Sequence, residues 1–123
     1  MKEEFNLNGM IYKQTRFQGY YITIDGEIAQ IKFDNEKLKS FFLMRTEKTK
    51  SGHLRVEINN KHYLIHRLVY ETWSDDCLNN TLVIDHIDAN PQNNHINNLR
   101  QVTQKINIKN GLGHGNFGHN HNT

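Results

Sequence analysis

An aspartate–histidine pair, Asp85-His86, directly follows the short apolar run Leu82-Val83-Ile84 and precedes a loop of short polar side chains. A histidine titrates near neutral pH, so His86 could accept a proton from a water molecule. The carboxylate of Asp85 is an oxygen ligand of the kind that Mg²⁺ and Mn²⁺ prefer. An Asp-His pair is common in proteins, so the pair alone does not identify a catalytic site.

Asparagines recur after this pair. Residues 88–98 form a turn-rich loop that ends at Asn98, and Asn107 follows in a segment that predicts a helix. A carboxylate together with a carboxamide oxygen is a hard, oxygen-only ligand set that suits Mg²⁺ or Mn²⁺. Clustered asparagines usually form turns, so Asn93 and Asn94 are expected to shape the loop rather than touch a substrate.

Two short strands should carry the pair and the end of the loop, one over residues 82–84 and one near residues 99–102. Adjacent residues of a regular strand point to opposite faces. Asp85 and His86 can therefore share a site only if the strand ends or distorts there, which the turn residues after them allow. A second helix is expected from Thr103, a suitable N-cap, to about Gly111.

The first half of the chain reads as antiparallel β-structure, followed by an amphipathic helix over roughly residues 66–73. Asp25-Gly26 predicts a hairpin between residues 20–24 and 28–33. A second hairpin is predicted from a strand at residues 40–45, through a turn at residues 50–52, to the alternating strand at residues 54–58. After a turn at Asn59-Asn60, residues 61–65 predict another strand. The expected fold class is therefore α+β.

Positive charge is concentrated in the middle of the chain. Residues 37–67 carry eight Lys/Arg against two Asp/Glu, although the net charge of the whole chain is only +2. Such asymmetry is typical of a protein that binds a polyanion, but a solvated basic face would look the same. No apolar run approaches the length of a membrane span, and the only cysteine, Cys77, excludes an internal disulfide. We expect a cytoplasmic protein with no membrane partner.

The order and spacing of these motifs resemble the HNH endonuclease superfamily, particularly the phage and intron-encoded homing type. The resemblance covers about residues 53–110, and a weaker one links residues 17–28 to a small β module often found before such domains. The motifs that carry it are His66-Arg67-Leu68-Val69, Trp73, Asp85-His86-Ile87-Asp88, Asn93-Asn94, Asn98-Leu99-Arg100, Val102-Thr103 and Asn107.

The resemblance implies a metal-dependent nuclease with a ββα-metal motif behind N-terminal β-hairpins, of a bacterial host or phage-encoded. His86 would be the general base that activates water, and the Asn98 amide would hold the loop against the strand. Asp85 and Asn107 would bind one divalent cation, Mg²⁺ or Mn²⁺. The third motif position is often histidine in the superfamily but is Asn107 here, so the motif is His-Asn-Asn. This departure bears on the preferred metal more than on the reaction.

Double-stranded DNA is the expected partner. Candidate backbone contacts are the basic residues of the central stretch and the histidine that begins the helix: Lys48, Lys50, Arg55, His66 and Arg67. With one Asp-His pair in the chain, a monomer would nick one strand at a time. Whether the protein is a monomer or a homodimer stays open, as does a role in homing, restriction or phage DNA processing.

Three segments are expected: a β module over residues 1–52 that contacts DNA, a nuclease domain over residues 53–110, and a flexible tail over residues 111–123 rich in Gly, His and Asn. One alternative is a DNA-binding module of the same fold without activity. Another is an interaction domain that binds metal or protein, suggested only by the tail histidines His114, His119 and His121.

Overall fold

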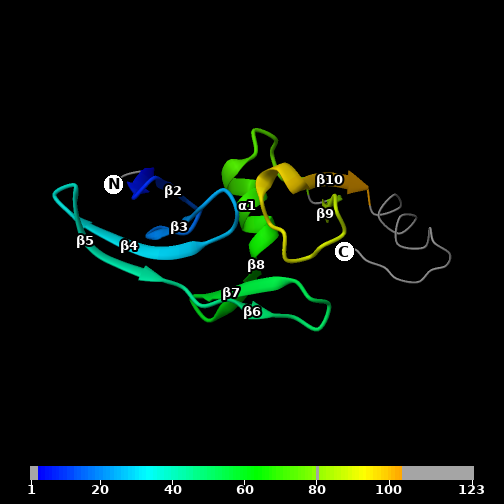
Figure 1. Ribbon diagram of the computed structural model, residues 1–123, viewed down its shortest axis with the longest axis horizontal. Coiled ribbons are helices and arrows are strands. Elements are labelled where there is room, and N and C mark those ends of the chain that lie inside the picture. The colour runs from blue at the N-terminus through cyan, green and yellow to red at the C-terminus, as the bar shows by residue number, and fades with distance from the viewer. Residues whose placement is uncertain (1–2, 80, 104–123) are drawn as a thin grey trace.

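The computed structural model describes residues 3–79 and 81–103, which form antiparallel sheets around one helix (Figure 1). The helix α1 (Ile65–Trp73) stands in the middle, with a five-stranded sheet on one side, a two-stranded ribbon on the other and a three-stranded sheet below. This is the expected α+β class. Within the described ranges, no helix has the length and apolar character needed to cross a membrane.

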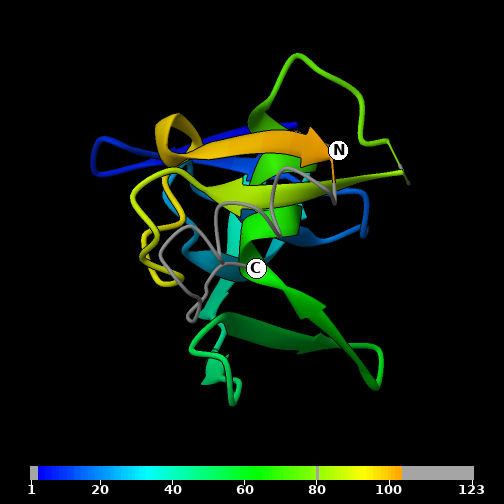
Figure 2. The same ribbon diagram turned by 90° about the vertical axis from the view of Figure 1, so that its right-hand side faces the viewer.

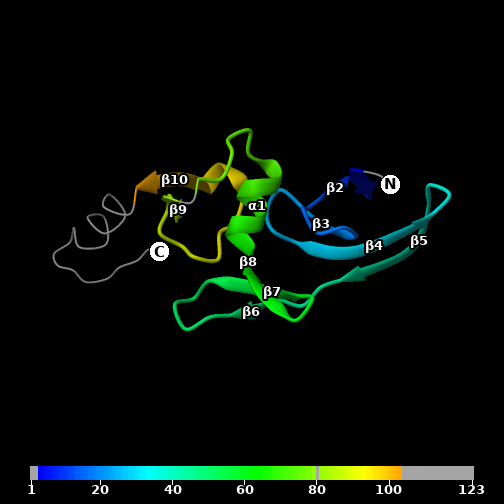
Figure 3. The same cartoon turned by 180° about the vertical axis from the view of Figure 1, so that it is seen from behind.

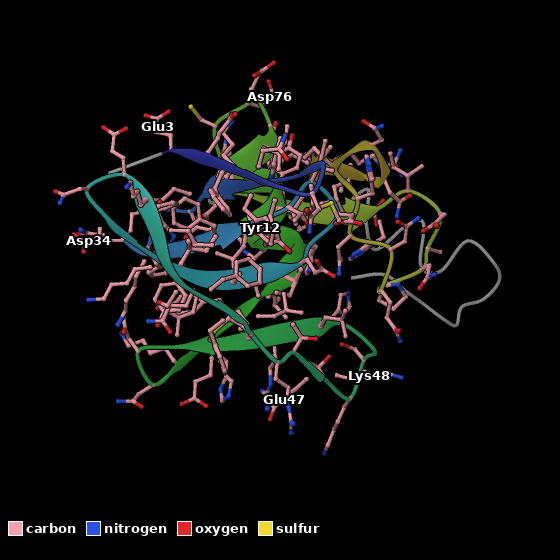
Figure 4. The ribbon with its side chains drawn as sticks, turned by 60° about the vertical axis from the view of Figure 1, so that its left-hand side comes forward. Glu3, Tyr12, Asp34, Glu47, Lys48 and Asp76 are labelled. Carbon is pink, nitrogen blue, oxygen red and sulfur yellow. The ribbon has the colours of Figure 1, made fainter. Side chains whose placement is uncertain are left out.

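The N-terminal sheet is a meander in which strands that follow each other in sequence also pair. Its strands are β1 (Glu4–Leu7), β2 (Met10–Gln14), β3 (Tyr20–Ile22), β4 (Ile28–Asp34) and β5 (Lys37–Leu43). The sheet encloses its own small apolar cluster, in which Tyr12 and Tyr21 are buried, and Figure 4 shows Tyr12 among these strands. The ring of Phe5 on β1 lies 5.4 Å from that of Phe33 on β4, so the sheet curls over this cluster.

Two hairpins of this sheet differ from the sequence prediction. The strand expected at residues 40–45 is β5, and it pairs with β4 through a turn at Asn35 and Glu36, which have φ angles of 52° and 68°. The prediction that it pairs with residues 54–58 is wrong. The β1–β2 hairpin was not predicted, although its turn is Asn8-Gly9, a strong hairpin signal.

The three-stranded sheet consists of β6 (Glu47–Lys48), β7 (Leu54–Ile58) and β8 (Lys61–Leu64). The predicted turn at residues 50–52 joins β6 to β7, and Asn59-Asn60, with φ angles of 54° and 69°, joins β7 to β8. The boundary expected between residues 52 and 53 therefore falls inside the β6–β7 hairpin.

The helix α1 packs against the surrounding strands through one apolar face, in which Ile65, Leu68 and Val69 are at most 1% exposed. The same core takes in Ile22 and Ile28 from the N-terminal sheet, together with side chains of β7, β9 and β10. The indole Nε1 of Trp73 also donates a hydrogen bond to the Ile22 carbonyl oxygen at 3.0 Å. The N-terminal sheet and the segment that resembles the nuclease domain thus share one core.

The ribbon consists of β9 (Leu82–His86) and β10 (Leu99–Thr103), joined by a loop that ends in the 3₁₀-helix η1 (Ile96–Asn98). Figure 2 shows both strands crossing in front of α1, and Figure 3 shows the β6–β8 sheet apart from them, below the helix. The helix expected after Thr103, which would complete a ββα motif, and the expected tail at residues 111–123 lie outside the described residues.

Candidate active site

The candidate site forms where β9 ends and its loop begins. Asp85 and His86 are the last two residues of β9, and they lie opposite Arg100 and Leu99 of β10. Both side chains are buried, at 4% and 6% exposed. β9 ends at His86 and a turn begins at Ile87, so regular strand geometry does not continue past the pair. Asp85 is bound by Arg100, and His86 by Asn94.

Asn98 closes the loop with both ends of its side-chain amide. Its Oδ1 accepts a hydrogen bond from the Asp88 backbone N–H at 3.0 Å, and its Nδ2 donates to Asp88 Oδ1 and to the Asn93 carbonyl oxygen. The Asn98 carbonyl oxygen also accepts from the Ile87 backbone N–H at 2.8 Å. These bonds join the end of the loop to the residues that directly follow His86.

The Asp88 carboxylate is the acceptor at the centre of this network. It accepts hydrogen bonds from the side chains of Asn93 and Asn98 and from the Asn90 backbone N–H. Because these bonds favour the ionised form, the pKa of Asp88 lies below its usual value. The loop is thus a polar network around one carboxylate, in keeping with the expectation that Asn93 shapes it.

His86 is flanked by two histidine rings and one amide. Its Nε2 is 2.8 Å from Oδ1 of Asn94, a residue that is only 3% exposed. The ring centroid of His66, from α1, lies 4.8 Å away, and that of His53, from the turn before β7, lies 5.5 Å away. The sequence expectation treated Asn94 as a loop former and did not single out His53.

Burial makes the two flanking histidines weak bases. Desolvation, with smaller contributions from His86, His53 and Arg67, lowers the pKa of His66 to about 3. Desolvation and His86 also lower the pKa of His53, whose Nδ1 lies 2.7 Å from Ser51 Oγ. His66 is 5% exposed and lies beside His86, and its expected contact with a DNA phosphate stays a prediction.

Asp85 forms an ion pair with Arg100. The Nε and Nη2 atoms of Arg100 both donate to Asp85 Oδ2, at 3.1 and 3.0 Å. Among the described residues, none donates to the second carboxylate oxygen, Oδ1. Arg100 is 45% exposed, whereas the Asp85 side chain is 5% exposed, so the arginine brings positive charge from the surface to a buried carboxylate. The sequence expectation assigned no role to this arginine.

The donor set fits a hard divalent cation only in part. Asp85 supplies one free carboxylate oxygen, and the second expected ligand, Asn107, lies outside the described residues. Over residues 3–79 and 81–103, no group of three or more His, Cys, Asp or Glu side chains is arranged to hold a metal ion. A cation bound here would thus depend on few protein ligands and on oxygen atoms of water or phosphate, as Mg²⁺ commonly does.

The expected DNA-contacting residues lie on the sheet below the helix and on the helix itself. Lys48 and Lys50 are exposed, and Figure 4 shows Lys48 pointing away from the fold. Arg55 is half-buried and donates to Glu47 Oε1 at 3.0 Å. Arg67 lines an open cavity of about 340 Å³ beside Arg16, whose guanidinium binds Glu71 at 2.8 Å.

Comparison with known proteins agrees with this geometry. Residues 63–109, which include α1, β9, the loop and β10, match the family model described as HNH endonuclease. The DNA endonuclease I-HmuI of Bacillus phage SP01 is 33% identical over 104 residues, which are 80% of this chain and 55% of I-HmuI. The SPbeta prophage-derived putative HNH homing endonuclease YosQ of Bacillus subtilis (strain 168) is 32% identical over 98 residues, with the same coverage.

A solved structure, titled DNA binding and cleavage by the HNH homing endonuclease I-HmuI, superposes with a TM-score of 0.65 at 27% identity and covers 95% of this chain and 62% of that one. The segment over residues 63–109 belongs to the HNH endonuclease family. I-HmuI comes from a phage and YosQ from a prophage, and both are named as HNH homing endonucleases, YosQ as a putative one. The chain spans about half the length of these curated relatives.

Proposed function

We propose that this protein is a metal-dependent endonuclease that hydrolyses phosphodiester bonds in double-stranded DNA and nicks one strand per binding event. The observation that carries the proposal is His86, buried at the end of β9 beside a loop closed by Asn98, inside the segment that matches the HNH family. The DNA endonuclease name of I-HmuI supports the choice of substrate.

In the proposed reaction, His86 takes a proton from water as the water oxygen bonds to phosphorus. The bond from phosphorus to the 3′ oxygen breaks, and this oxygen leaves with the electron pair and is protonated from solvent. The products are 5′-phosphate and 3′-hydroxyl ends. Asp85 and Asn107 would hold one Mg²⁺ or Mn²⁺, which supplies charge neutralisation at the phosphate and at the leaving oxygen. Asn98 holds the loop that shapes the site.

Nicking follows from the number of sites. The sequence holds one Asp-His pair, and one site in one orientation meets one strand of an antiparallel duplex. A double-strand break would need a second copy or a second encounter.

The base is tested by His86→Ala, assayed on supercoiled plasmid with added Mg²⁺. We expect cleavage to be lost while DNA affinity and thermal stability change little. His62→Ala is the matched control, because His62 is an exposed histidine of β8 and should keep full activity. Retention of most activity in His86→Ala would refute the mechanism, and a wild-type protein that binds DNA but never cleaves would favour an inactive binding module.

DNA contact is proposed for Lys48, Lys50 and Arg55, which project from or beside the β6–β7 hairpin, and for Arg67. Each phosphate contact that is lost should flatten the slope of log K against log salt by about one unit. The triple variant of Lys48, Lys50 and Arg55 to alanine should thus bind DNA more weakly and with a smaller slope. Unchanged affinity and slope would show that the hairpin is only solvated.

A further inference from the structure

We propose that Asn94 is the positioning residue that holds His86 in the tautomer with its proton on Nε2, which leaves Nδ1 as the nitrogen that accepts the proton from water. The inference rests on the proposed role of His86 as base and assigns the atom that performs it. It also gives Asn94 a task beyond shaping the loop.

The first step of the argument is the hydrogen bond. The atom of Asn94 that lies 2.8 Å from His86 Nε2 is the amide oxygen Oδ1. An amide oxygen accepts and does not donate, so Nε2 must carry the hydrogen. Neutral imidazole has one N–H, and the lone pair is then on Nδ1. Among the described residues, none hydrogen-bonds to Nδ1.

The second step is the rigidity of both partners. Asn94 is 3% exposed and His86 is 6% exposed, so water competes little for their bond. The rings of His66 and His53 lie against His86 and limit its rotation. Asn94 is itself held from the N-terminal sheet, because its Cβ lies next to Gly26 in the β3–β4 turn. Two residues later, the Ile96 backbone N–H donates to the Ile24 carbonyl oxygen at 3.0 Å.

The third step is the consequence of the opposite arrangement. If the Asn94 amide were flipped, its Nδ2 would donate to a His86 Nε2 that carries no hydrogen, and the proton of His86 would be on Nδ1. Both nitrogens would then be engaged or protonated, and His86 would have no lone pair for water. Only the acceptor oxygen of Asn94 is therefore compatible with His86 as base.

The test measures the tautomer directly. Long-range ¹H–¹⁵N correlation spectra of the full-length protein at pH 8 distinguish an imidazole protonated on Nε2 from one protonated on Nδ1, with His86 assigned by comparison with His86→Ala. We expect the Nε2–H pattern in the wild type and in Asn94→Asp, which keeps an acceptor oxygen, and a mixture of both patterns in Asn94→Ala. Asn97→Ala is the matched control from the same loop, because the Asn97 side chain is exposed, and it should keep the wild-type pattern.

Kinetics give the second readout. Asn94→Ala should lower kcat roughly 10- to 100-fold, the loss typical of hydrogen-bond partners that orient metal-ligating histidines, while KM for DNA stays nearly constant. Asn94→Asp should recover most of the activity. An Nδ1–H pattern in the wild type, or unchanged tautomer and kcat in Asn94→Ala, would overturn the inference. An Nε2–H pattern with full activity in His86→Ala would instead reject the base and leave the hydrogen bond standing.

Discussion

Gly26→Ala should lower both stability and activity, because Gly26 lies in the β3–β4 turn, where the N-terminal sheet packs against Asn94 of the active-site loop. Its φ of 102° lies in the region that L-residues rarely adopt, and alanine there costs about 1–2 kcal/mol. The added Cβ would also lie 2.9 Å from Cγ2 of Ile65, which is fully buried, and 3.3 Å from the Cβ of Asn94. Crowding of a packed core costs about 1–3 kcal/mol.

Together the two effects lower the free energy of unfolding by about 3 kcal/mol. For a domain of about 100 residues, this corresponds to a fall in Tm of roughly 10–20 °C. The crowded Cβ of Asn94 must shift if the alanine is accommodated, so kcat for nicking should fall as well, even well below the Tm. Calorimetry and a plasmid nicking assay measure the two effects on the same protein.

Gly19→Ala is the matched control, because Gly19 has a φ of 87° but no heavy atom within 4 Å of where its Cβ would lie. It carries the backbone strain without the crowding, and its Cβ would not contact Asn94. We expect a smaller fall in Tm and normal kcat. Equal losses in both variants would refute the argument that the turn packs against the loop.

Three further predictions concern the ion pair, the buried histidine and the product. Arg100→Ala leaves the buried Asp85 carboxylate without its partner and should lower the free energy of unfolding by about 1–3 kcal/mol, measured by urea titration, whereas Arg100→Lys should lose less. The unfolded chain binds a proton at residue 66 below about pH 6.5, but folded His66 does so only near pH 3. The contribution of His66 to the free energy of unfolding should therefore be complete above pH 6.5 and fall as pH drops toward 3, by up to about 1.4 kcal/mol per pH unit. In urea titrations, the midpoint of His66→Gln should fall less than that of the wild type between pH 7.5 and pH 5. On supercoiled plasmid, open circles should accumulate before linear DNA and only with added Mg²⁺ or Mn²⁺; direct linearisation or full activity in excess EDTA would contradict this.

The parts of the fold that were predicted correctly depend on local signals. Asp25-Gly26 and Asn59-Asn60 are turn residues that tolerate positive φ, and both join paired strands. The apolar spacing of residues 65–73 and the apolar run before Asp85 likewise identified α1 and β9. Such signals act within a few residues, so a pattern along the chain is enough to find them.

Pairing and clustering over long distances were not predictable in the same way. Residues 40–45 have an apolar character that fits a strand, but nothing local says whether the partner precedes or follows, and the turn at Asn35-Glu36 decides it. The histidines at positions 53, 66 and 86 come from three elements and meet only because those elements pack on a shared core. The β1–β2 hairpin is a different case, because Asn8-Gly9 was a usable local signal.

The geometry at His86 depends on parts of the chain that are far apart in sequence. Its own strand supplies the histidine, the loop supplies Asn94, and the β3–β4 turn supplies the surface against which Asn94 packs. Ile22 and Ile28, on either side of that turn, anchor it in the core that also contains side chains of α1 and β9. A bond of 2.8 Å between two buried side chains tolerates little displacement before it is lost. The N-terminal sheet is therefore part of the support of the candidate active site, and a change in how the sheet packs on α1 would reach His86 through Asn94.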